Sequence, residues 1–216
     1  MDEYDLILRI FKEYNRLDLV VKDAKDIPQK IILLCDWVHH QIPLWSYGGN
    51  VEKAEVTQNP IHQLLAIKNG VLRGWCENYA ILLIAACESI GLGARHVLLS
   101  KKLELGVDRH NVVEVWRPIK HRWMVLDPMF NIHFVNSHNT NEYLSTEEVS
   151  KLVNNNGIDD VGIIHPVFSD HLNASQRFKQ NILNYFHKCE YFDADGKKIE
   201  KVRYYDLMVR QAVQNE

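Results

Sequence analysis

Residues 71–99, which read VLRGWCENYAILLIAACESIGLGARHVLL, decide the fold of this chain. From Cys76 to Ile90 the residues are good helix formers, and Gly91 follows at the place where a helix would end. Apolar residues recur there at spacings of three and four, which is typical of a helix face that packs on a core. Further leucine and alanine residues widen this face, so we expect a helix over 76–90 that is buried on most sides.

Cys76 lies in the first turn of this predicted helix. Unpaired N–H groups and the positive end of the helix dipole are found at such a position, and both favour a negative charge. They would therefore favour the thiolate of Cys76, which is the nucleophilic form of cysteine. Taken alone, however, a free cysteine is more often a buried structural residue, as we expect for Cys35 and Cys87.

After Gly93 the sequence pattern changes from helical to extended. Three segments rich in valine and leucine follow, and polar or turn residues separate them. Pro118 begins a short turn between the last two, so we expect these two to pair as an antiparallel hairpin. The predicted strands are 94–100 (ARHVLLS), 110–116 (HNVVEVW) and 122–127 (RWMVLD).

Three residues in this region have the chemistry of a thiol enzyme. His110 begins one strand of the predicted hairpin and Asp127 ends the other, so the pairing would bring the two side chains together. Cys76 would join them if the start of its helix faces the same edge. The three would then be a nucleophile, a general base and a carboxylate that orients the base. Each alone has an ordinary structural explanation, but their joint order favours the catalytic one.

At these residues the sequence resembles the core of the transglutaminase-like superfamily, within the broad papain-like group of cysteine enzymes. The resemblance extends over residues 28–130 and depends on four blocks that stand in the family's order. An upstream helix with Asp36-Trp37-Val38 also resembles the helix that precedes this core. The four blocks are Gly74-Trp75-Cys76-Glu77-Asn78-Tyr79-Ala80, Gly91-Leu92-Gly93-Ala94-Arg95, His110-Asn111-Val112 and Trp123-Met124-Val125-Leu126-Asp127-Pro128.

The resemblance implies an α+β fold in which the nucleophile helix packs on an antiparallel sheet that carries the histidine and the aspartate. It implies that Cys76 is the nucleophile, that His110 is the general acid and base, and that Asp127 orients His110. Attack on an amide carbonyl would form a thioester, which is then transferred to water or an amine. We expect residues 1–135 to hold N-terminal helices plus this core, and residues 136–216 to form a C-terminal extension packed on the same domain.

Two groups are candidates for stabilising the oxyanion of the reaction intermediate. One is the backbone N–H of Cys76. Transglutaminases use the indole of an upstream tryptophan, and the resemblance gives this role to Trp45 in the irregular segment 43–59, whereas Trp37 is expected in the core. Glu77 follows the nucleophile directly; because a carboxylate disfavours a nearby thiolate, we expect Glu77 to point away from Cys76.

Composition argues against several classes of function. The chain of 216 residues has a formal net charge of −3 and no long run of one sign, which disfavours a nucleic-acid or membrane surface. It has neither a stretch of ~20 apolar residues that could span a membrane nor a signal peptide at its start. Its four scattered cysteines then suggest free thiols and a cytoplasmic location. The histidines lack metal-ligand spacing to a cysteine pair, so we expect neither metal nor cofactor.

Two classes of function stay open at this point. The first is a thiol hydrolase or acyltransferase that acts on a peptide, protein or small amide substrate. Within it a peptidase or amidase is favoured over protein cross-linking, because the resemblance covers only the compact core. Removal of glycans from asparagine is disfavoured, because the zinc-binding cysteine pairs that often accompany it are missing. The second class is a non-catalytic binding or scaffold protein, which would be expected to lose one of the three site residues. The oligomeric state is not predicted.

Periodicity and capping residues assign the other segments. Asp26, Asn59 and Ser145 each precede a helical pattern and are expected to cap it. We predict helices over 3–17, 26–42, 60–67 and 174–187, a short helix from 145, an irregular segment over 157–173, and a final hairpin that turns at Asp195-Gly196.

Overall fold

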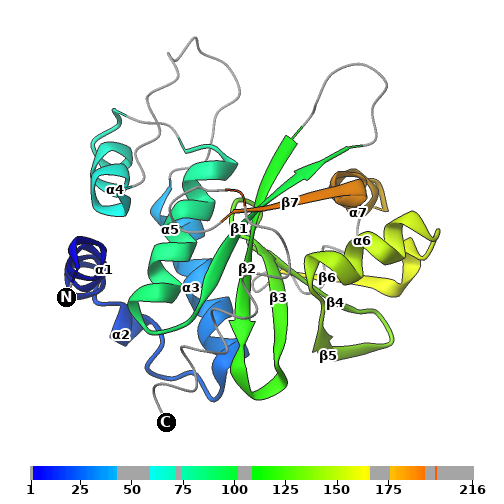
Figure 1. The fold of residues 1–216 in the computed structure, drawn as a ribbon, viewed down its shortest axis with the longest axis horizontal. Coiled ribbons are helices and arrows are strands. Elements are labelled where there is room, and N and C mark those ends of the chain that lie inside the picture. Colours follow the sequence, from blue (N-terminus) through cyan, green and yellow to red (C-terminus); the bar gives the residue numbers. More distant parts are fainter. Residues whose placement is uncertain are drawn as a thin grey trace.

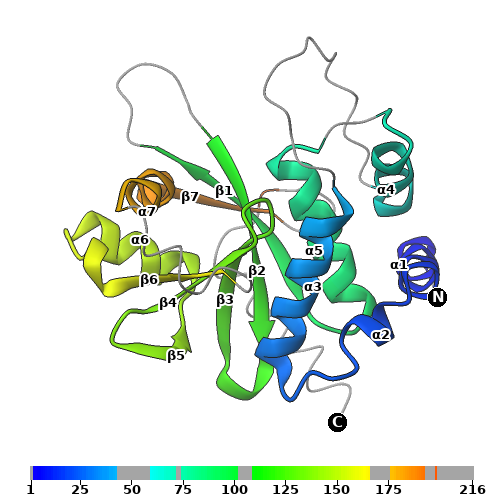
Figure 2. The ribbon, with the colours of Figure 1, turned by 180° about the vertical axis from the view of Figure 1, so that it is seen from behind.

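Within the residues that it describes, the computed structural model contains a seven-stranded antiparallel sheet with helices on both faces (Figures 1 and 2). The fold is therefore α+β, as predicted. The described residues are 2–42, 59–71, 74–101, 109–165, 176–192 and 198. The strand order is β5 (Asn139–Tyr143), β4 (Ile132–Asn136), β3 (Arg122–Asp127), β2 (Arg109–Arg117), β1 (Ala94–Ser100) and β7 (Lys188–Phe192), and β6 (Val161–Ile164) pairs with β4 outside that path.

The helices form two groups, one on each face of the sheet (Figures 1 and 2). The first group consists of α1 (Glu3–Asn15), α2 (Leu17–Val20), α3 (Ile27–Gln41), α4 (Pro60–Lys68) and α5 (Cys76–Ser89). The second group consists of α6 (Thr146–Asn154), α7 (Gln176–Leu183) and the 3-10 helix η4 (Asn184–His187). The 3-10 turn η1 (Pro118–Lys120) connects β2 to β3, and the 3-10 turn η2 (Ile158–Asp160) lies between α6 and β6.

Three helices, α3, α4 and α6, begin directly after the residues that were expected to cap them. The Asp26 carboxylate accepts a hydrogen bond from the backbone N–H three residues later at 2.8 Å. The Asn59 side chain accepts from two N–H groups at the start of α4. Ser145 and Glu148 form a reciprocal capping box at the start of α6. These side chains satisfy N–H groups that the first turn of a helix leaves unpaired.

Two helices end earlier than their periodicity predicted. α1 ends at Asn15, because Arg16 adopts the left-handed conformation with φ 52° and a separate short helix, α2, follows it. α7 ends at Leu183, and η4 continues the chain to His187 in a tighter turn. The stop predicted at Gly91 is confirmed: this glycine has φ 81°, which a residue with a side chain rarely adopts.

α5 is surrounded by other elements of the fold. All of its residues from Asn78 to Cys87 are buried, and the helix packs on α1 and α3 as well as on β1 and β2. The prediction of a helix buried on most sides is confirmed. Cys87 and Cys35 lie in this core, and burial raises the pKa of both thiols. Neither is therefore a candidate nucleophile.

Successive residues of β2 contribute to different cores, one on each face of the sheet. Val113 and Val115 pack in the cluster that contains α5, whereas Val112 packs in the cluster that contains α6 and η4. The second cluster includes Phe134 and Phe186, whose ring centroids lie 5.0 Å apart. Because side chains alternate along a strand, His110 shares the face of Val112 and Asn111 shares that of Val113.

The sequence patterns did not predict β4, β5 or β6. The expectation of an irregular segment over 157–173 is wrong at Val161–Ile164, which pair in register with β4 as β6. β6 has only four residues, and β5 reads NTNEY with exposed or half-buried side chains, so neither has a marked apolar alternation. Pairing with β4, rather than local propensity, makes these segments strands.

The chain beyond residue 135 contributes both edge strands of the main strand order. β5 is one edge strand, and β7, which pairs antiparallel with β1, is the other. Phe192 forms an antiparallel bridge with Lys198, while the turn predicted at Asp195-Gly196 lies outside the described residues. The division of the chain at residue 135 stays a prediction.

Candidate active site

Cys76 is the first residue of α5, as the sequence predicted within one turn. The N–H of Trp75 donates to the side-chain oxygen of Asn78 at 2.8 Å, which fixes the chain where the helix begins. Gly74 leaves no space for a side chain, because a Cβ atom there would lie 2.4 Å from Cγ2 of Ile42. Ile42 is buried at the end of α3, so the glycine allows the start of α5 to pack against α3 and thereby places the cysteine.

His110 and Asp127 meet at the end of the hairpin formed by β2 and β3. Nε2 of His110 lies 2.6 Å from Oδ2 of Asp127, which confirms the predicted contact. Asp127 is fully buried, and its other oxygen accepts hydrogen bonds from the N–H groups of Met129 and Phe130 at 3.1 and 3.2 Å. Both oxygens of the carboxylate therefore have partners within the protein, and the carboxylate holds one orientation toward the imidazole.

Cys76 is the third member of this group. Its thiol forms a side-chain hydrogen bond with His110, and because Nε2 of that ring faces Asp127, Nδ1 is the nitrogen left for the sulfur. Burial by itself would raise the pKa of the Cys76 thiol, but the hydrogen bond and charge of His110, with hydrogen bonds from Asn111, lower it. Burial likewise opposes protonation of His110, yet the charge and hydrogen bond of Asp127 raise the pKa of His110 to about 10. Both shifts favour a thiolate beside an imidazolium.

Aromatic side chains surround the imidazole of His110. Its ring centroid lies 5.5 Å from that of Phe130 and 5.3 Å from that of Tyr185. Tyr185 belongs to η4, and the amino group of Lys101 lies 4.1 Å from the centroid of its ring. His110 is only 6% exposed, so these rings shield it from water. No sequence pattern indicated Tyr185, because its position depends on how η4 packs beside β1.

Two further polar residues are connected to the sulfur. Nδ2 of Asn111 donates to Sγ of Cys76 at 3.2 Å, and Nε2 of His96 lies 2.6 Å from Oδ1 of Asn111. Sequence reasoning singled out neither residue. The available signal was position alone, since Asn111 directly follows His110 and His96 lies on the predicted neighbouring strand.

A comparison with protein-family models matches residues 17–128 to the transglutaminase-like superfamily. The chain belongs to this superfamily. Among solved structures it is similar to a crystal structure described as that of a candidate cysteine protease from Cytophaga hutchinsonii, with 15% identity and a TM-score of 0.39. The match covers 76% of this chain and 52% of that protein, so the chain spans about half of its length. A comparison with curated proteins finds no match.

The superfamily match includes all three residues of the predicted triad. Membership of the superfamily suggests a cysteine-based enzyme. The second block of the resemblance ends at Arg95, and this residue has a structural partner: its Nε donates to Glu114 Oε2 at 2.8 Å inside the sheet. In this chain the matched segment therefore contains both a reactive group and a buried ion pair.

The oxyanion donors of this superfamily member stay a prediction. Trp45, to which the resemblance gives that role, lies outside the described residues. Trp37 packs against Phe11 with ring centroids 6.0 Å apart, in agreement with its expected core position. The N–H of Cys76 remains a candidate, because the first N–H groups of a helix have no partner within it.

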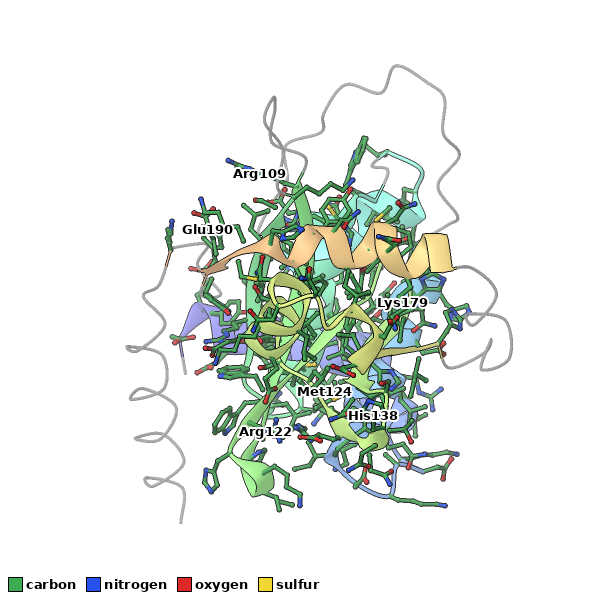
Figure 3. The ribbon with its side chains drawn as sticks, turned by 90° about the vertical axis from the view of Figure 1, so that its right-hand side faces the viewer. Arg109, Arg122, Met124, His138, Lys179 and Glu190 are labelled. Carbon is green, nitrogen blue, oxygen red and sulfur yellow. The ribbon has the colours of Figure 1, made fainter. Side chains whose placement is uncertain are left out.

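The candidate site lies at the end of the sheet opposite the turn between β2 and β3. Figure 3 shows Arg109, which directly precedes His110, and Arg122, which follows that turn, at opposite ends of the hairpin. Cys76 faces the first of these ends, because it contacts two successive residues that point to opposite faces of β2. The sulfur can contact side chains on both faces of β2 only if it lies near the end of that strand.

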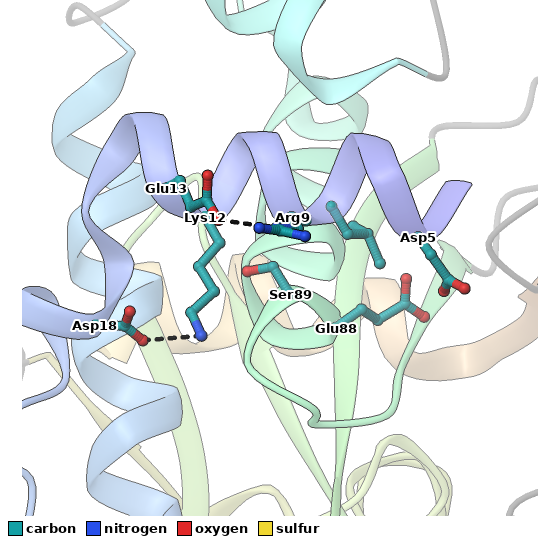
Figure 4. Close-up of a pocket in the computed structure, with 8 residues that line it drawn as sticks. Asp5, Arg9, Lys12, Glu13, Asp18, Glu88 and Ser89 are labelled. Carbon is teal, nitrogen blue, oxygen red and sulfur yellow. Dashed lines mark hydrogen bonds and ion pairs between the residues drawn. The ribbon is translucent and has the colours of Figure 1, made fainter. Parts of the chain in front are cut away.

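A separate groove lies between α1 and the C-terminal end of α5 (Figure 4). Its volume is about 410 Å³, and several of its charged side chains pair with one another, as in Arg9–Glu13 at 2.9 Å and Lys12–Asp18 at 3.0 Å. Glu88 and Ser89 line it, so the groove is at the other end of α5 from Cys76. It is therefore no part of the candidate active site.

In the part of the chain that the structure describes, no group of three or more histidine, cysteine, aspartate or glutamate side chains is arranged to hold a metal ion. The helices seen there are too short or too polar to cross a bilayer. The four cysteines are all free thiols.

Proposed function

We propose that this protein is a cysteine enzyme that acts on amide bonds through a thioester intermediate. In this proposal Cys76 is the nucleophile, His110 is the general acid and base, and Asp127 orients His110. The observation that carries the proposal is the continuous set of contacts from the sulfur through the imidazole to a fully buried carboxylate. Membership of the transglutaminase-like superfamily supports the same assignment.

The proposed reaction has two halves. In the first, the thiolate of Cys76 attacks the carbonyl carbon of the substrate, a C–S bond forms, and the carbonyl oxygen becomes negatively charged. The C–N bond then breaks, and the leaving amine takes the proton that His110 carries. In the second half, His110 removes a proton from water or an amine, which attacks the thioester and expels the thiolate. Asp127 keeps its contact with the imidazole throughout and stabilises the imidazolium.

We propose hydrolysis as the second half-reaction, with a peptide, protein or small amide as the substrate. The resemblance that supports it covers the compact core of the superfamily, and transfer to an amine would use the same first half. The two outcomes differ in the product. A panel of fluorogenic peptide amides in buffer alone, and then with a fluorescent primary amine, separates them, because only transfer attaches the amine to the acyl group.

The mechanism is tested by the reactivity of the thiol. We expect iodoacetamide to alkylate Cys76 with a pH midpoint clearly below the ~8.5 of an ordinary thiol. Cys76→Ala should abolish this fast labelling and all turnover of the peptide amides. Cys189→Ala is the matched control, since Cys189 is also only partly buried and should leave both unchanged.

Two results would contradict the proposal. Turnover that persists in Cys76→Ala would exclude this cysteine as the nucleophile. A pH midpoint at the ordinary thiol value in the wild-type protein would show that the thiolate is not stabilised, and would favour a binding or scaffold protein that keeps the fold.

A further inference from the structure

The sulfur of Cys76 accepts hydrogen bonds from two successive residues of β2. His110 is one donor. Asn111 is the other, through Nδ2 of its side chain at 3.2 Å from Sγ. A thiolate with several donors is stabilised relative to the thiol, because hydrogen bonds to the charged form favour ionisation.

The side-chain amide of Asn111 is held in one orientation by its other contact. Its Oδ1 lies 2.6 Å from Nε2 of His96. A thiolate only accepts hydrogen bonds, so the NH₂ group must face the sulfur and the oxygen must face His96. His96 must then carry a hydrogen on Nε2 and donate it. The two contacts are satisfied together by this one arrangement of the amide.

His96 is itself fixed within the sheet. It lies on β1, where it faces Val113 of β2 on one side and Phe192 of β7 on the other. The rings of His96 and Phe192 lie with centroids 5.7 Å apart. Burial lowers the pKa of His96, against the opposing effects of its hydrogen bond to Asn111 and the charge of Glu77. A neutral imidazole therefore serves as the donor, and its position depends on packing in the sheet.

We propose that Asn111 is a further catalytic residue, which stabilises the thiolate of Cys76, and that His96 is a positioning residue, which orients the amide of Asn111. The inference rests on the proposed function. It assigns different tasks to neighbouring residues: His110 gives and takes a proton, whereas the amide of Asn111 keeps its hydrogens and stabilises charge. It also makes His96 of β1 part of the hydrogen-bond network that stabilises the thiolate of Cys76.

The experiment measures the pH midpoint of Cys76 alkylation by mass spectrometry in a graded set of variants. Asn111→Ala removes the side-chain donor and should raise the midpoint by about one pH unit, the scale of one hydrogen bond to a charged group. Asn111→Asp keeps the size and adds a negative charge, so it should raise the midpoint further. Retention of the wild-type thermal unfolding temperature shows that each variant is folded.

The role of His96 is tested by a pair of substitutions. His96→Phe removes the donor and should raise the midpoint by less than Asn111→Ala, because the amide is freed but not lost. His96→Gln retains a donor and should restore part of the wild-type value. His138→Phe is the control, since His138 is exposed in the turn between β4 and β5 and should have no effect.

The outcomes separate this inference from the proposed function. If Cys76 shows a lowered midpoint in the wild-type protein but folded Asn111→Ala and Asn111→Asp keep it, the assignment of Asn111 is overturned and the nucleophile stands. If the two His96 variants give the same midpoint as the wild type, the positioning role is overturned. If the wild-type midpoint is that of an ordinary thiol, the proposed function fails first.

Discussion

Glu114 and His110 lie on the same strand, and each is buried against a partner of opposite charge, but only one of the two pairs reaches a reactive atom. Glu114 pairs with Arg95 in the middle of the sheet. His110 pairs with Asp127 near the end of the strand, where Cys76 begins α5. His110 and Glu114 are four residues apart on one strand, so their side chains lie on the same face of the sheet. The two pairs differ in the groups that surround them.

The Arg95–Glu114 pair is enclosed by partners. One oxygen of Glu114 accepts from Arg95 and the other accepts from the N–H of Thr146 at 2.6 Å. The guanidinium carbon lies 4.0 Å from the ring centroid of Trp123 and 4.3 Å from that of Tyr191. These contacts link β1, β2, β3, β7 and α6, so the pair acts as a structural connection.

The His110–Asp127 pair has fixed partners at one end only. The carboxylate has its backbone hydrogen-bond donors, but the other partner of the imidazole is the Cys76 sulfur, whose charge changes with pH. A buried ion pair is therefore structural when all its partners are fixed groups. It becomes reactive when the last partner is a nucleophile.

The largest effect is expected from removing the charge of Asp127. Asp127→Asn should lower turnover by about 10³- to 10⁴-fold, as loss of the orienting carboxylate does in related triads. In the wild-type protein, turnover should fall as pH rises through about 10, where His110 loses its proton. The substitution removes the largest cause that raises this pKa and leaves burial, which lowers it, opposed by the hydrogen bond and charge of Cys76 alone, so the alkaline limit should move to lower pH.

The pH profile of turnover on a peptide amide is the measurement for Asp127→Asn. Asp160→Asn, which alters an exposed partner of His138, is the control and should leave the profile as it is. An unchanged alkaline limit in folded Asp127→Asn would contradict the proposed role of the carboxylate.

A slightly smaller effect is expected at the Arg95–Glu114 pair, on the stability of the protein instead of its activity. Glu114→Ala leaves Arg95 buried without its carboxylate and should reduce the free energy of unfolding by about 3–5 kcal/mol. Denaturant unfolding measures this change. The double variant Arg95→Met with Glu114→Leu should recover most of it, and the Cys76 alkylation midpoint of the folded protein should stay at the wild-type value. A loss below about 1 kcal/mol would show that the pair is not structural.

The smallest effect concerns another buried histidine, His133. Burial, together with the charge of His165, lowers the pKa of His133 to about 4, the opposite direction from His110. The unfolded chain, with an ordinary pKa near 6.5, then binds the proton more readily, so stability falls as pH decreases from about 6.5 toward 4. Between pH 7 and 5 this amounts to about 2 kcal/mol, which His133→Phe should largely remove.

Unfolding free energies at the two pH values measure the effect of His133. The exposed His138→Phe serves again as the control and should leave the acid sensitivity in place. If His133→Phe loses as much stability on acidification as the wild-type protein, another group is responsible.

The central part of the fold was predictable because its signals are local. The helix period of α5, the Asp26 and Asn59 caps and the valine-rich segments of β2 and β3 each determine one element without help from the rest of the chain. β4 and β6 differ, because their few residues become strands by pairing with each other. The pairing of β4 with β6 therefore cannot be predicted from any single short segment of the sequence.

The same distinction applies to the candidate site. The contact between His110 and Asp127 follows from a hairpin between adjacent strands, so the sequence was sufficient to predict it. The contact between His96 and Asn111 requires the register of β1 against β2, and the position of Tyr185 requires the packing of η4. These contacts depend on tertiary arrangement, which composition and spacing do not determine.

The two partners of β1 are made at very different times during synthesis. Ser100 faces Arg109 on one side and Lys188 on the other, so the second edge of this strand stays unpaired on the ribosome until the late segment emerges. Closing such a long loop is slow and costs entropy. Until the segment that carries Tyr185 packs beside His110, the imidazole consequently lacks one of the two aromatic neighbours that shield it in the folded protein.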